Sequence, residues 1–318
     1  MKRIKMWSAV LVAATMIGSA TAQSVEEVGL KMKEAGELLN NKQLVQAIPV
    51  LEEVIRMGQE VGADAADIVA EAQKVLPACY QQKGSNLYKA KDMEGAIAAF
   101  SKAADLAELQ GNVMMSRQLG RAISQLYMAQ GIASFNTKDY TKALESFQKG
   151  VAQDPSNIQL AYYTAKSYAE LGKLEEAVAL YRQVIAAGAE NSKFAEQAKG
   201  AQADLNNYLL VAASEAAKAG DIEKVQAYAA MIPENADAGL LLIQTANNLK
   251  KYDIVVANGA EAYAAQQNEA QKANIAYLLG IAYQNRGNNA KAIEWLKKVT
   301  AGGNVAAAKA LASELAAQ

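Results

Sequence analysis

Residues 127–157, YMAQGIASFNTKDYTKALESFQKGVAQDPSN, and residues 161–191, AYYTAKSYAELGKLEEAVALYRQVIAAGAEN, carry one pattern twice. The second copy follows the first at an offset of 34 residues. Equivalent positions keep their size: Gly131 matches Ala165, Ala143 matches Ala177, and Phe147 matches Tyr181. A self-match at this period indicates repeated structural units, each with an apolar face that it cannot bury alone.

Each copy has the residues expected of two helices joined by a tight turn. Gly131 and Ala143 are small, and small residues let two helix backbones approach within the usual packing distance. Phe147 follows Ala143 by four residues and therefore shares its helical face. Asp154 precedes Pro155, which disfavours helical backbone at Asp154 and ends the unit. The pattern therefore predicts stacked helix hairpins.

The two copies resemble the tetratricopeptide repeat, a helix-turn-helix unit of this length. The resemblance is carried by small residues at positions 8, 20 and 27 of the unit, a large one at 24 and proline at 32, which are Gly131, Ala143, Gly150, Phe147 and Pro155. It implies an all-α fold, a right-handed α-solenoid of about seven such units. A C-terminal capping helix is expected over residues 304–318.

Other parts of the chain repeat the pattern at wider spacing. Equivalent alanines at 47, 96 and 143 are 49 and 47 residues apart, which exceeds the spacing of the family. We therefore expect longer helices there, with breaks at Gly62 and Gly111. The solenoid is expected over residues 23–318, with the clearest repeats at 77–110, 124–157, 158–191 and 273–306, and weaker ones at 28–61, 206–235 and 236–269.

The composition argues against several classes of function. The chain has no histidine, which removes Ser-His-Asp and Cys-His catalysis and histidine metal ligation. Its single cysteine, Cys79, cannot form an intrachain disulfide or a cysteine metal cluster, and we expect it to be a buried apolar residue. A formal net charge of −1 gives no electrostatic footprint for nucleic acid. We expect no enzymatic activity, no cofactor, no metal and no nucleic-acid partner.

The first 22 residues have the pattern of a secretory signal peptide. A basic start precedes an apolar run over residues 6–17, which is shorter than the roughly 20 residues that a membrane-spanning helix needs. A small-x-small motif places the cleavage site between Ala22 and Gln23. No cysteine follows, so we expect a soluble periplasmic protein without a lipid anchor or membrane span. An uncleaved anchor or a buried helix is the alternative.

The resemblance also implies a binding surface, because the first helices of such repeats line an inner, concave face. We expect this face to hold a helix or an extended segment of a partner protein. The predicted groove residues are Tyr88, Met128, Ile132, Phe135, Tyr162 and Lys166. The alternative is that these side chains pack on the neighbouring repeat. One family subtype grips a C-terminal carboxylate with Lys and Asn at positions 5 and 9, and that pair is absent here.

The sequence therefore predicts an exported scaffold or adaptor that binds other proteins, with partners that the sequence does not name. A second hypothesis is a solenoid that binds envelope polysaccharide or peptidoglycan through stacked tyrosines on the same face. A saccharide pull-down compared with a protein pull-down distinguishes the two.

Overall fold

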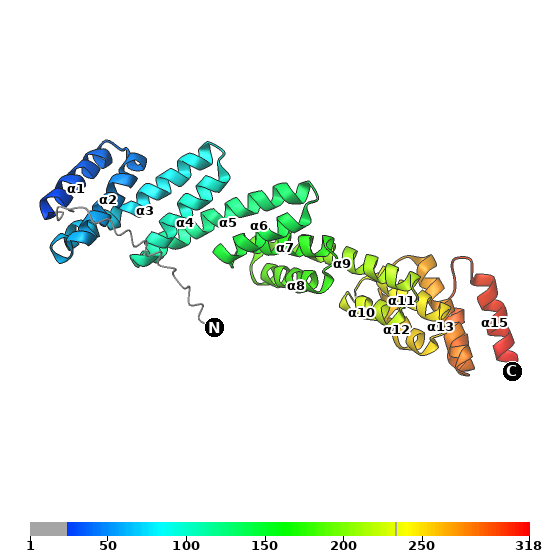
Figure 1. Cartoon of the computed structure of the whole chain (residues 1–318). Helices are drawn as coiled ribbons and strands as arrows, with labels where there is room; N and C mark the ends of the chain where they lie inside the picture. Colours follow the sequence, from blue (N-terminus) through cyan, green and yellow to red (C-terminus); the bar gives the residue numbers. More distant parts are fainter. Residues whose placement is uncertain (1–23, 233) are drawn as a thin grey trace. The chain divides into compact units, whose positions relative to one another are not determined.

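The computed structural model describes residues 24–232 and 234–318, which form fifteen α-helices, two short 3-10 helices and no strand (Figure 1). The expected leader, residues 1–22, and its cleavage site at Ala22 and Gln23 lie outside the described residues. The described residues fall into two compact units, one ending at Leu126 and the other beginning at Tyr127.

The first unit consists of two helix hairpins and the start of a third. Its elements are α1 (Val25–Asn40), α2 (Leu44–Val61), η1 (Ala63–Ala65), α3 (Ala66–Lys89), α4 (Met93–Leu109) and the beginning of α5 (Val113–Asn136). Val28, Leu51 and Val54 are fully buried in the core that α1 and α2 share with α3. Cys79 on α3 is buried in the same core, as the sequence predicts.

The second unit contains the end of α5 and the remaining helices. These are α6 (Tyr140–Gln153), α7 (Ile158–Glu170), α8 (Leu174–Glu190), η2 (Ser192–Phe194), α9 (Ala195–Lys218), α10 (Ile222–Met231), α11 (Ala236–Asn248), α12 (Tyr252–Ala265), α13 (Glu269–Asn285), α14 (Asn289–Lys297) and α15 (Val305–Ala317). Helix α15 packs on α14, where Leu296 and Leu315 join one apolar cluster.

All seven hairpins of the described residues turn in the same way. One residue between the two helices has positive φ: 60° at Lys42, 65° at Lys91, 62° at Lys138, 72° at Gly172, 72° at Gly220, 55° at Lys250 and 74° at Gly287. In each turn the next amide bonds back to a carbonyl five residues earlier, as Asp139 does to Ser134 at 3.0 Å. This is the Schellman ending of a helix, which requires a left-handed residue.

An acidic or amide side chain then begins the second helix in four of the hairpins. Asp92, Asp139, Asp221 and Asn288 each accept a hydrogen bond from the backbone N–H three residues on, at 2.9–3.1 Å. Such a cap satisfies one of the free N–H groups of the first helical turn. The short motif of a left-handed residue followed by Asp or Asn therefore reverses the chain.

Small residues face large ones inside the hairpins, as the sequence pattern predicts. A Cβ placed on Gly131 would lie 2.3 Å from the ring of Phe147, and one on Gly84 would lie 2.6 Å from the ring of Phe100. Ala143 is fully buried. The close approach of each pair of helices therefore depends on the absence of a side chain at the glycine.

The predicted all-α fold of seven hairpins and a last single helix is confirmed in the described residues. The wide spacing of the first repeats has the expected cause, because α3 and α5 are each 24 residues long. The predicted repeat at 77–110 accordingly begins in the middle of α3. A single solenoid over residues 23–318 stays a prediction.

Candidate functional site

Helices α5, α7 and α9, each the first helix of its hairpin, bring predicted groove residues of the second unit together. At one side of α7, Gly200 of α9 leaves room for Tyr162, because a Cβ at Gly200 would lie 2.9 Å from the tyrosine oxygen. At the other side, the ring of Phe135 on α5 lies 6.4 Å from that of Tyr163. Helix α7 thus links α5 to α9.

Aromatic rings of the five helices from α5 to α9 form a continuous series, in which Phe147 on α6 and Tyr181 on α8 are fully buried. Phe135 meets Tyr140 edge-on with centroids 5.1 Å apart, and Phe147 stacks on Tyr163 at 5.5 Å. The series continues from Tyr162 to Tyr181 at 6.3 Å and from Tyr181 to Tyr208 at 6.4 Å. Aromatic pairs at these distances and angles add to the stability that area burial provides, so the rings hold one another in place. This series of rings is called the aromatic wall below.

A lysine and an aspartate lie at the centre of this wall. Lys166 Nζ is 3.4 Å from a carboxylate oxygen of Asp204, and it lies 5.9 Å from the ring centre of Phe135 and 5.3 Å from that of Tyr162. The Tyr162 hydroxyl donates to the same carboxylate at 2.8 Å. Asp204 therefore fixes both side chains, and Lys166 is held over two aromatic faces.

A second carboxylate, that of Glu170, accepts a hydrogen bond from the Tyr208 hydroxyl. Burial, followed by the nearby carboxylates, raises the pKa of Tyr162 and of Tyr208 well above the usual range of tyrosine. Burial also raises the pKa of Tyr181, whose hydroxyl is enclosed and has no hydrogen-bond partner among the described residues. All three tyrosines stay neutral at physiological pH, and Tyr162 and Tyr208 act as hydrogen-bond donors rather than as bases.

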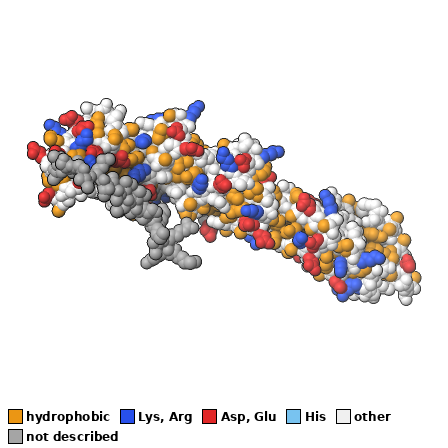
Figure 2. Space-filling model, viewed as in Figure 1, with side chains coloured by type: hydrophobic (Ala, Val, Ile, Leu, Met, Phe, Trp, Pro, Cys, Tyr) orange, Lys and Arg blue, Asp and Glu red, His pale blue; other side chains and the backbone are white. Residues whose placement is uncertain are grey.

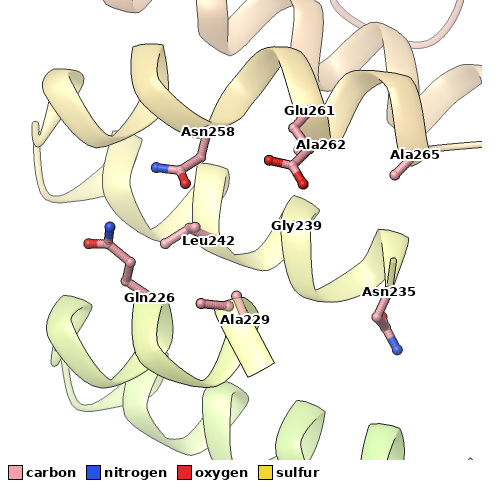
Figure 3. A pocket seen from close by; sticks show the side chains of 10 residues that line it. Gln226, Ala229, Asn235, Gly239, Leu242, Asn258, Glu261, Ala262 and Ala265 are labelled. Carbon is pink, nitrogen blue, oxygen red and sulfur yellow. The ribbon is translucent and has the colours of Figure 1, made fainter. Parts of the chain in front are cut away.

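The described residues contain hollows outside the wall. One of about 250 Å³ lies among α10, α11 and α12 (Figure 3), and its lining includes Gln226, Asn235, Leu242, Asn258 and Glu261. Another of about 240 Å³ lies among α6, α7 and α8, beside Pro155 and Tyr168. On the face that Figure 2 shows, acidic and basic side chains are interspersed along both units.

Metal and nucleophile chemistry finds little support in the part of the chain that the structure describes. Its Cys, Asp and Glu residues form no group of three or more suited to a metal ion. Burial raises the pKa of the Cys79 thiol, which makes the reactive thiolate rarer. Among the described helices, none combines the length and the apolar character that a membrane span requires.

Comparison with known families identifies the repeats. Models of the tetratricopeptide repeat match residues 128–192 and residues 273–301. The chain contains tetratricopeptide repeats. The matched ranges cover the hairpins from α5 to α8 and from α13 to α14, where the sequence pattern is clearest.

Several known proteins are similar to this chain at low identity. A Hsp70/Hsp90 co-chaperone, CNS1, from Saccharomyces cerevisiae is 26% identical over 131 residues, which is 38% of this chain and 32% of that protein, so the chain spans about a third of its relative. The crystal structure of the P58(IPK) TPR domain is 13% identical, covers 91% of this chain and 97% of that one, and has a TM-score of 0.29. The crystal structure of a tetratricopeptide repeat protein from Parabacteroides merdae is 11% identical, covers 91% of this chain and 99% of that one, and has a TM-score of 0.27.

The predicted groove residues lie on the first helices of hairpins. Five of them belong to the second unit and are partly buried: Met128, Ile132, Phe135, Tyr162 and Lys166. The first three pack against the core formed by Ala143, Phe147 and Leu160. Tyr88, on α3 in the first unit, is 55% exposed. The structure thus places the Lys166 ammonium group beside the rings of Phe135 and Tyr162.

Sequence reasoning missed Asp204 and Tyr208, the partners that α9 supplies. The weaker repeat was expected to begin at residue 206, whereas α9 begins at Ala195 and has 24 residues. A signal was present, because Ala177 and Val225 are 48 residues apart, close to the spacings that reveal the other long helices. That spacing would have extended the helix back to include Asp204.

Proposed function

We propose that this chain is an exported protein-interaction scaffold that holds a segment of a partner protein on the first helices of its tetratricopeptide repeats. The binding surface is the part of the aromatic wall that α5, α7 and α9 contribute in the second unit, with the partly buried rings of Phe135, Tyr162 and Tyr208. The one observation that carries the proposal is the placement of Lys166 over the rings of Phe135 and Tyr162, with all three side chains partly exposed.

The chemistry of this surface suits a peptide. Partly buried aromatic side chains supply contact area at a low cost in conformational entropy, and such side chains are enriched at the centres of protein interfaces. Lys166 and Asp204 offer a donor and an acceptor whose geometry is fixed by their neighbours. A preorganised surface loses little entropy when a partner binds.

The repeat class and a relative support the same proposal. Tetratricopeptide repeats are helical repeat units with extended concave binding surfaces. The yeast protein that matches 38% of this chain is named as a co-chaperone of Hsp70 and Hsp90, and so acts on other proteins. The carboxylate-gripping Lys and Asn pair of one repeat subtype is absent here, so the partner segment is not expected to be held by its C-terminal carboxylate.

Site-specific photocrosslinking in cells tests the proposal. A photoreactive phenylalanine analogue replaces Phe135, and a matched control places it at Glu145, an exposed position on α6, which is a second helix. We expect protein adducts from position 135 that are absent from position 145, with circular dichroism showing that both variants fold. Equal labelling at both positions would argue against a specific surface.

Two further measurements separate the alternatives. Substitution of Phe135 or Tyr162 by Ala should reduce crosslinking before it reduces thermal stability, whereas the reverse order means that these rings serve only to pack the repeats. Retention of the purified chain on peptidoglycan, together with no protein adduct, would favour the polysaccharide hypothesis.

For export, the intact mass of material from the periplasm should correspond to a chain that begins at Gln23.

A further inference from the structure

The hollow among α10, α11 and α12 lies apart from the aromatic wall and has a defined set of polar groups. Ten residues line its 250 Å³, and neither lysine nor arginine is among them. Its polar side chains are those of Gln226 on α10, Asn235 before α11, and Asn258 and Glu261 on α12. The lining therefore carries one negative charge and no positive charge.

The hydrogen bonds already made within the helices decide which polar atoms remain available. The Asn258 amide nitrogen donates one hydrogen to the carbonyl of Ile254 at 2.9 Å, which leaves its oxygen and a second N–H for the hollow. Asn235 caps α11 and accepts two backbone N–H groups, so its oxygen is already used and its side chain offers the hollow only N–H donors. Figure 3 shows the Glu261 carboxylate and the Asn258 amide directed from α12 into the space, with Gln226 on α10 at its other side. The Glu261 carboxylate can only accept, and the amide oxygens of Asn258 and Gln226 are further acceptors, while the amide side chains also keep N–H donors.

The floor of the hollow is apolar. Ala229, Leu242 and Ala262 line it and are only 7%, 4% and 6% exposed. Gly239 of α11 adds a surface without a side chain, opposite Ala262 at 3.1 Å from the position that a Cβ would take. A ligand that fits this site has an aliphatic stem along the floor and a hydrogen-bond donor at its end.

We propose that this hollow binds the side chain of a lysine from a partner protein. The four methylene groups lie along Ala229, Leu242 and Ala262, as lysine stems do on apolar surfaces. The ammonium group has three donors and no acceptor, which matches the Glu261 carboxylate and the oxygens of Asn258 and Gln226. The absence of a basic lining residue disfavours free lysine, whose own carboxylate would have no counterion here. The site lies among α10, α11 and α12 and is separate from the surface of the proposed function.

Methyl NMR of the full chain, with ¹³C-labelled alanine and leucine methyl groups, tests this inference. The probe is the capped tripeptide acetyl-Ala-Lys-Ala-amide, and its matched control contains norleucine in place of lysine. We expect the lysine peptide to shift the methyl signals of Ala229, Leu242 and Ala262. The norleucine peptide should bind about tenfold more weakly, because it lacks the charge-assisted hydrogen bonds.

Variants of the protein test whether the charge of Glu261 contributes to binding of the lysine peptide. Glu261→Gln keeps the shape of the side chain and removes its charge. Because Glu261 is exposed, this change should lower the affinity for the lysine peptide only about three- to fivefold. Glu223→Gln, at an exposed site on α10 outside the hollow, should leave binding unchanged. Both variants should retain the helical circular dichroism of the parent.

Several results would overturn the inference. Equal binding of the lysine and norleucine peptides would show that the hollow does not recognise the ammonium group. No effect of Glu261→Gln, or methyl shifts confined to other helices, would show that the peptide binds elsewhere. Tighter binding of free lysine than of the capped peptide would assign the hollow to a free amino acid. None of these outcomes bears on crosslinking from position 135, so the proposed function is tested separately.

Discussion

The backbone conformation of the turn between α5 and α6 allows a quantitative prediction. Lys138 has φ of 62°, a conformation in which the Cβ of an L-residue is crowded by the following carbonyl. The equivalent position holds glycine in three of the seven hairpins, at Gly172, Gly220 and Gly287. We predict that Lys138→Gly stabilises the second unit.

The magnitude follows from two opposing effects. Left-handed backbone costs a residue with a side chain roughly 1–2 kcal/mol, and glycine avoids this cost. Glycine also gives the unfolded chain more freedom, which offsets about 0.4–1 kcal/mol. Because the Lys138 side chain is exposed, its removal loses little packing. The net expectation is a stabilisation of about 0.5–1 kcal/mol.

Lys149→Gly is the matched control, because it makes the same substitution at an exposed site inside α6, where the backbone is helical. Glycine there should destabilise the unit by about 1 kcal/mol. Urea unfolding of the two variants and the parent, followed by circular dichroism, measures both effects as shifts of the midpoint at constant slope. If Lys138→Gly lowers the midpoint as Lys149→Gly does, the left-handed turn stores no strain and the reasoning fails.

Three other predictions concern packing, capping and pH. Gly131→Ala should cost about 1–3 kcal/mol by forcing a methyl group against Phe147, whereas Gly36→Ala, with no atom within 4 Å, should gain about 0.5–1 kcal/mol; thermal unfolding compares the two. Asp139→Ala should cost about 1 kcal/mol through loss of the cap on α6, measured by urea unfolding. Burial and then its hydrogen bond to a glutamate raise the pKa of Tyr80 to about 12, above its unfolded value of about 10, so the stability that it contributes is complete below pH 10 and is lost as the pH rises to 12. Tyrosinate absorbance of the parent and of Tyr80→Phe checks this, and a Tyr80 titration at the ordinary value would contradict it.

The sequence alone determined the parts of this protein that depend on local chemistry. Spacing of small and large residues fixes which helix faces meet, as at Gly131 and Phe147. Short turn motifs such as Lys138-Asp139 reverse the chain through one left-handed residue and one cap. These signals lie within a few residues of one another, so a reader of the sequence can find the hairpins and their order.

Only the tertiary structure decided which side chains of the predicted surface hold one another. Asp204 reaches Tyr162 across 42 residues, and Tyr208 reaches Glu170 across 38, through contacts between helices that no local pattern encodes. The hollow beside Glu261 likewise arises where three helices meet. Such sites depend on the distance and rotation between packed helices, which the sum of many side-chain contacts sets and which sequence spacing does not specify.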